Sequence, residues 1–143
     1  MKRYMALDVG DATIGIAVSD MLGLTAQGVE TIRRKSLQDD LARLGELMKE
    51  YETQSLVSGL PKNMNGTEGP RCEIVRAFMA DVQEAFPEAE ISFWDERLST
   101  VGAERSLLEA DVSRKKRKKV IDKMAAVFIL QGFLDRRRQM THG

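Results

Sequence analysis

The chain has 143 residues, of which 43% are hydrophobic and 31% charged, so it is long enough for one core but not for two. No apolar run is as long as a membrane-spanning helix. The single cysteine, Cys72, cannot form an internal disulfide. We therefore expect one cytoplasmic domain, spanning residues 1–143, that does not enter a membrane.

The net charge of zero hides a segregation of charge along the chain. Residues 1–96 carry 10 Lys and Arg against 17 Asp and Glu, whereas residues 97–143 carry 12 against 5. This pattern favours an acidic site that can hold a metal together with a basic surface that can hold a polyanion. Clustering of ordinary surface charges along helices is the alternative.

The first third of the chain has the pattern of three closely spaced strands. Tyr4 to Val9 is a compact apolar run, Ile14 to Ser19 alternates and is rich in β-branched residues, and Gln27 to Arg33 is a plausible third strand. The short turns between them predict an antiparallel meander.

The remainder alternates between helical and strand patterns. Leucines at helical spacing from Leu37 to Met48, with Ser36 as N-cap, predict the first helix. The later segments are a strand at Ser55–Ser58, a loop at Gly59–Gly69, a helix at Glu73–Phe86, a strand at Ile91–Trp94, a helix from Ser99 to about Ala110 and a helix from Val120 to about Arg138. This order predicts an α/β fold with a five-stranded mixed sheet, in which three antiparallel strands are followed by two parallel ones.

Acidic side chains follow two of these strands and begin the last helix. Asp8 ends an apolar strand, Asp95 and Glu96 come directly after the fifth strand, and Asp122 precedes the small residues Ala125 and Ala126. Brought together, these carboxylates would suit Mg²⁺ or Mn²⁺, and two such ions can drive phosphodiester cleavage. The alternatives are structural: a turn cap at Asp8, an ion pair between Asp95 and Arg97, and a helix-dipole charge at Asp122.

Four ordered blocks of sequence resemble the YqgF family, also called RuvX. They are Leu7-Asp-Val-Gly10 with Thr13 to Asp20, Gly59 to Glu68, Asp95 to Thr100, and Ile121 to Ala126. The resemblance implies a ribonuclease-H-like fold related to the RuvC resolvases. It places the acidic site on Asp8, on Asp95-Glu96 and on Asp122, and we take Glu96 as the metal ligand of its pair, with Asp95 second.

Two polar segments are candidates for contact with nucleic acid. In the loop Pro61 to Thr67, Lys62 can contact a phosphate, Asn63 and Asn65 can bond sugar or phosphate oxygens, and Thr67 can cap the next helix. A plain turn at Asn65-Gly66 is the alternative. Six consecutive cations lie between Ser113 and the last helix, either as a solvated loop or as a polyanion site, with Arg97 as a further contact. They are Arg114, Lys115, Lys116, Arg117, Lys118 and Lys119.

We therefore expect a metal-dependent nuclease that cleaves structured nucleic acid. The family resemblance favours processing of the 5′ end of pre-16S ribosomal RNA, with resolution of Holliday-junction DNA as the second candidate. A non-catalytic nucleic-acid-binding module is a rival. A phosphotransferase fragment of the actin-like class is another, because Asp8-Val-Gly10 followed by Thr13 is similar to its phosphate loop. The sequence does not indicate an oligomeric state.

Overall fold

The structure is a computed structural model that describes residues 2–98 and 114–142. Its elements follow the predicted order in the described ranges. In chain order they are β1 (Tyr4–Val9), β2 (Thr13–Ser19), β3 (Ala26–Arg33), α1 (Leu37–Glu50), β4 (Ser55–Leu60), α2 (Pro70–Ala85), β5 (Glu90–Asp95), the 3₁₀ turn η1 (Glu96–Leu98) and α4 (Arg114–His142).

The five strands form one mixed sheet in the order β3-β2-β1-β4-β5. β1 pairs antiparallel with β2, and β2 antiparallel with β3, whereas β4 pairs parallel with both β1 and β5. The predicted sheet is therefore confirmed. Because β1, β4 and β5 run in the same direction, their carboxyl ends meet at one edge of the sheet, which is where ligands of open α/β sheets usually bind.

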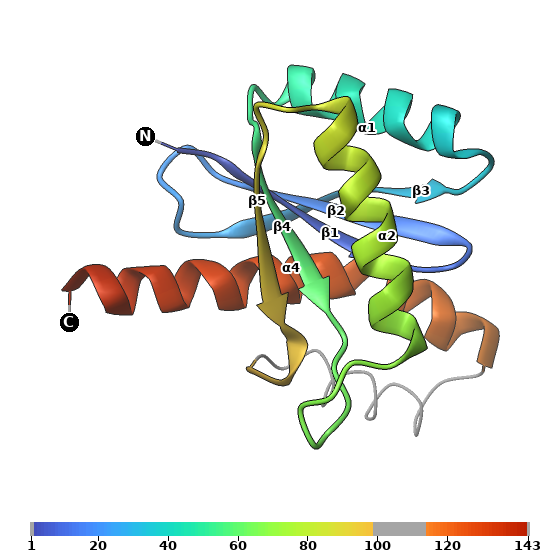
Figure 1. Ribbon diagram of the computed structural model, residues 1–143. Coiled ribbons are helices and arrows are strands. Elements are labelled where there is room, and N and C mark those ends of the chain that lie inside the picture. Colours follow the sequence, from blue (N-terminus) through green and yellow to red (C-terminus); the bar gives the residue numbers. More distant parts are fainter. Residues whose placement is uncertain (1, 99–113, 143) are drawn as a thin grey trace.

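Helices cover both faces of this sheet (Figure 1). α1 and α2 lie on one face, and α4 crosses the other, where it packs against β1, β2, β3 and β4. Side chains of β1 alternate between the two cores: Met5 and Leu7 pack with α1 and α2, whereas Tyr4 and Ala6 pack with α4. Each face of β1 is therefore committed to a different helical layer.

The ends of α1 confirm one detail of the sequence pattern. Ser36 is its N-cap, and the Ser36 hydroxyl accepts a hydrogen bond from the backbone N–H of Asp39 at 3.1 Å. This contact satisfies one of the N–H groups that have no partner within the helix.

Two predicted details are wrong. α4 begins at Arg114, so the six cations form its first turns and not a loop before it; Lys and Arg are good helix formers, and nothing in this run stops a helix. Thr67 does not cap α2, because the cap position is Gly69, followed by Pro70 at the first helical position. The helix predicted from Ser99 to about Ala110 lies outside the described residues.

Within the described ranges, every helix falls short of the length or the apolar character that crossing a lipid bilayer requires.

Candidate active site at the carboxyl edge of the sheet

Asp8 lies at the end of β1 on the face that α4 covers. Successive side chains of a strand point to opposite faces, so Asp8 lies on the face opposite to Leu7 and Val9, which pack under α1 and α2. It lies on the same face as Tyr4 and Ala6, which pack under α4. The carboxylate is only partly buried, and its partner in β2 is Gly15, which has no side chain to cover it. Asp8 is thus an acidic group on an otherwise buried strand, at the edge where β4 and β5 also end.

The turn after Asp8 is held by an arginine that the sequence did not single out. Arg34 donates from its guanidinium to the Gly10 carbonyl at 2.9 Å and to the Asp40 carboxylate at 3.2 Å, and its backbone N–H donates to the Ala12 carbonyl at 2.8 Å. Asp40 is 3% exposed. Acidic residues are common in the first turn of a helix, where they interact with the helix dipole. The sequence therefore did not indicate that Asp40 pairs with Arg34.

Asp95 is engaged by Arg97, as the structural alternative predicted. Arg97 Nε donates to both carboxylate oxygens at 3.1 Å, and Arg97 Nη2 donates to Oδ2 at 2.7 Å. The Arg97 backbone N–H adds a fourth contact, to Oδ1, at 3.0 Å. These bonds, with a smaller contribution from the charge of Lys62, hold the pKa of Asp95 below its ordinary value. Asp95 is therefore ionised and committed to Arg97.

Glu96 is 7% exposed and lies against the end of β4. Its Oε2 would be 3.0 Å from a Cβ atom at Gly59, and Ile129 of α4 is the other neighbour of that position. Glu96 consequently lies on the α4 face, like Asp8. Asp95 lies on the opposite face, because it alternates with Trp94, which packs in the core under α4. Gly59 is a site residue that sequence reasoning missed, because its importance depends on the approach of α4.

Asp122 lies on α4, and its side chain is outside those the structure describes. After this point α4 packs closely on the sheet, because the small residues Ala125 and Ala126 are buried at 2% and 1% exposure. Among the side chains that are described, no three acidic, histidine or cysteine groups gather at metal-binding distance. All three proposed ligands, Asp8, Glu96 and Asp122, therefore stay predictions.

The loop from Pro61 to Gly69 is built from its own polar side chains. Asn63 Nδ2 donates to the Thr67 hydroxyl at 2.9 Å, and that hydroxyl donates to Asn65 Oδ1 at 2.6 Å. Arg97 reaches the loop, donating to the Met64 carbonyl at 3.4 Å. The contacts that were predicted to substrate from Asn63 and Asn65 stay predictions, and here both side chains hold the loop in shape.

Two cations stand beside this edge of the sheet. Lys62 is close enough to lower the pKa of both Glu68 and Asp95 by its charge, after the larger contributions of Arg76 and Arg97. Arg97 joins η1 to the loop at Met64. The carboxylates of the edge are therefore flanked by positive charge, which an incoming phosphate would meet.

Comparison with known proteins identifies the family. The family model described as "RuvX: Holliday junction resolvase" matches residues 2–136. The chain belongs to the RuvX family. A relative from Clostridioides difficile is 62% identical over 133 residues, covering 93% of this chain and 94% of its own, and one from Symbiobacterium thermophilum is 59% identical over 135 residues, covering 94% and 93%. Both are named "Putative pre-16S rRNA nuclease".

Solved structures share the fold of this RuvX-family chain. Thermus thermophilus RuvC in complex with a Holliday junction substrate has a TM-score of 0.57 at 13% identity, covering 96% of each chain. A second structure of T. thermophilus RuvC has a TM-score of 0.55 at 14% identity. The predicted ribonuclease-H-like fold of the RuvC type is therefore confirmed.

Proposed function

We propose that this protein is a divalent-metal-dependent nuclease that works in the cytoplasm as a single domain of residues 1–143. The observation that carries the proposal is the common placement of Asp8 and Glu96 on the α4 face of the sheet's carboxyl edge, in a chain of a nuclease family. Two carboxylates on one face of this edge supply the oxygen ligands that divalent cations prefer.

The donor set fits Mg²⁺ or Mn²⁺. Carboxylate oxygens are the ligands these hard cations prefer, and when bound they supply the charge neutralisation and water activation that phosphodiester hydrolysis needs. We assign Asp8, Glu96 and Asp122 to this set. Asp122 precedes Ala126 by four residues and Ile129 by seven, and helical periodicity groups these three positions on one side of α4. Ile129 is the residue of α4 that meets Gly59 beside Glu96.

The remaining polar residues of the edge are assigned to substrate positioning. Asp95 holds the Arg97 guanidinium through three contacts, so that its free side can meet a phosphate. Lys62 adds a second positive charge, and the run Arg114–Lys119 lies in the first turns of α4, before Asp122. Neutralising several phosphates at once gives affinity without sequence preference and makes binding dependent on salt.

The substrate we favour is pre-16S ribosomal RNA, cleaved near its 5′ end, because the relatives at 62% and 59% identity carry that name. Holliday-junction DNA is the second candidate, because the family description names it. A non-catalytic module with the same fold is the rival from another class, and the family's nuclease activity counts against it.

One experiment separates these possibilities. Purified protein is incubated with a labelled pre-16S RNA fragment and with a four-way DNA junction, in the presence of Mg²⁺, Mn²⁺ or a chelator. We expect cleavage of the RNA that needs the metal. Asp8→Asn and Glu96→Gln should lose cleavage by several orders of magnitude and should also lose the rise in melting temperature that the metal produces.

Asp95→Asn is the matched control, because it neutralises the adjacent carboxylate on the opposite face. It should retain metal-dependent cleavage at saturating substrate and the metal-induced rise in melting temperature, while binding substrate more weakly because Arg97 is held less firmly. An inactive Asp95→Asn beside an active Glu96→Gln would exchange the two roles. Normal cleavage by both variants would remove the metal site from the mechanism, and metal-dependent cleavage of the junction alone would replace the RNA with DNA as substrate.

A further inference from the structure

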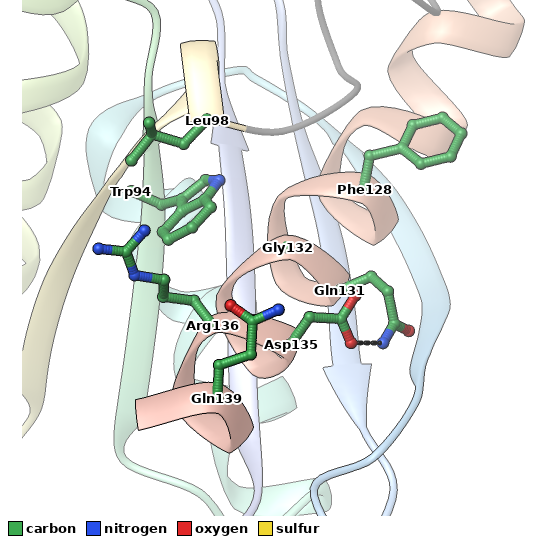
Figure 2. Close-up of a pocket in the computed structure, with 8 residues that line it drawn as sticks. All are labelled: Trp94, Leu98, Phe128, Gln131, Gly132, Asp135, Arg136 and Gln139. Carbon is green, nitrogen blue, oxygen red and sulfur yellow. Dashed lines mark hydrogen bonds between the residues drawn. The ribbon is translucent and has the colours of Figure 1, made fainter. Parts of the chain in front are cut away.

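A cavity of about 310 Å³ lies between the end of β5 and the outer flank of α4 (Figure 2). Figure 2 shows Leu98 and Phe128 at the end of the cavity where β5 finishes, and Arg136 and Gln139 toward the other end. We call it the Trp94 cavity. Its lining residues are Trp94, Leu98, Phe128, Gln131, Gly132, Asp135, Arg136 and Gln139.

The wall of the Trp94 cavity contains a buried hydrogen-bond donor without an acceptor. Trp94 is 8% exposed, and its Nε1 is fully buried and makes no hydrogen bond with any described residue. Its ring packs edge-on to Phe133, with 6.4 Å between ring centroids. A buried N–H that stays unpaired costs stability, so buried donors almost always have a partner. A ligand in the cavity that supplies an acceptor, with a small shift of the wall that covers Nε1, would remove that cost.

The far end of the cavity presents a cation that is not used in the fold. Arg138 is paired with Asp135, whereas Arg136 is exposed and makes no ion pair with any described residue. Gln131 is fully used, since its amide bonds the Leu24 carbonyl and Asp135, each at 3.0 Å. Arg136 is therefore the group at this end that is available to an anion.

The Trp94 cavity lies next to the proposed active site. Trp94 is the register partner of Gly59, the residue against which Glu96 Oε2 lies. On the other wall, Phe128 directly precedes Ile129, which also packs against Gly59. A polymer whose phosphate reaches Glu96 can thus continue past Leu98 and Phe128 into the cavity.

We propose that the Trp94 cavity binds one unpaired base of the strand that flanks the cleaved bond, with the next backbone phosphate at Arg136. The inference rests on the proposed nuclease function and adds a preference for an unpaired strand. Leu98 and Phe128 provide apolar contact for the base faces, and the edge of every base carries acceptors for the Trp94 N–H. The volume is at the lower end of ligand pockets, which suits one base and not a longer segment. Bases inside a duplex are stacked on both faces and paired on their Watson–Crick edges, so they cannot enter the cavity without leaving the duplex.

The chain contains a single tryptophan, so its fluorescence reports on this cavity alone. The probe is a single-stranded RNA of about eight nucleotides, titrated in chelator so that nothing is cleaved. We expect saturable quenching of Trp94 by the single strand and none by a blunt duplex of the same sequence. Quenching by neither, or equal quenching by both, would overturn the proposal.

Variants test the geometry by the anisotropy of the labelled single strand. Gly132→Leu fills the cavity and should weaken binding by about tenfold, whereas Gly132→Ala leaves most of the space and should bind like the wild type. Trp94→Phe keeps a ring but removes the N–H, and should weaken binding severalfold; it keeps the proposal testable if Gly132→Leu does not fold. Wild-type affinity in both Gly132→Leu and Trp94→Phe would refute the cavity as the binding site.

Arg136→Gln should weaken single-strand binding and reduce its dependence on salt by about one phosphate contact. Lys49→Gln is the matched control, because it removes one positive charge from exposed α1 on the opposite face of the sheet, and it should leave that slope unchanged. Equal slopes for Arg136→Gln and wild type would remove the phosphate contact. Failure of the nuclease proposal has a different signature, namely single-strand quenching without metal-dependent cleavage of the structured RNA.

Discussion

The contact between Gly59 and α4 yields a quantitative prediction. A Cβ atom at Gly59 would lie 2.4 Å from Cδ1 and 3.1 Å from Cγ1 of Ile129, which is itself completely buried. Gly59→Ala must therefore repack Ile129 or move α4 away from the sheet. Overpacking of this kind costs about 1–3 kcal/mol of unfolding free energy. Urea unfolding, with the midpoint and slope compared with those of the wild type, measures the loss.

A double-mutant cycle isolates the contact. Ile129→Val removes Cδ1 and alone should cost about 0.5–1.5 kcal/mol, but combined with Gly59→Ala it should recover about 1 kcal/mol or more relative to the sum of the single changes. Gly59→Ala should also reduce cleavage, because its methyl group would lie 3.0 Å from Glu96 Oε2. That contact remains in the double variant, so its cleavage should be reduced as well. A Gly59→Ala protein with the wild-type midpoint, or strictly additive single changes, would refute the close approach of α4.

Asp8→Asn should fold, but Mg²⁺ or Mn²⁺ should no longer raise its melting temperature in a thermal scan, and a wild-type shift would exclude Asp8 as a ligand. Asp95→Asn should lower the unfolding free energy by about 1 kcal/mol at neutral pH, since the Arg97 partner is 37% exposed. The folded-state pKa of Asp95 is lowered from 3.8, so this contribution to stability is complete above that value and is lost as pH falls through the lowered pKa. Urea unfolding at neutral and at acidic pH should show that the unfolding free energies of the variant and the wild type become equal in acid. The basic run contains four lysines, Lys115, Lys116, Lys118 and Lys119. Neutralising them together should weaken nucleic-acid binding and reduce its dependence on salt, while turnover at saturating substrate is retained. Anisotropy and cleavage at several salt concentrations measure both effects.

The sequence by itself determined most of the secondary structure and singled out Asp8 as a candidate carboxylate of the site. The compact apolar run Tyr4–Val9 predicts the bounds of β1 correctly, and the Ser36 cap is present as predicted. Both signals are local, because a strand-length apolar run and a helix cap depend only on neighbouring residues. Asp8 was also identifiable, because a charged residue in an otherwise apolar strand is costly to bury unless it is paired, coordinated or exposed at the end of the strand.

Tertiary structure decided which residues act together. Asp95 and Glu96 are adjacent, and no local pattern shows which of the two faces the site. The pairing of Asp95 with Arg97 and the placement of Glu96 beside Gly59 distinguish them. The need for glycine at position 59 likewise appears only when Ile129 arrives from a helix far along the chain. Such contacts join residues distant in sequence, and periodicity carries no information about distances between elements, so only the packing of α4 on the sheet could decide them.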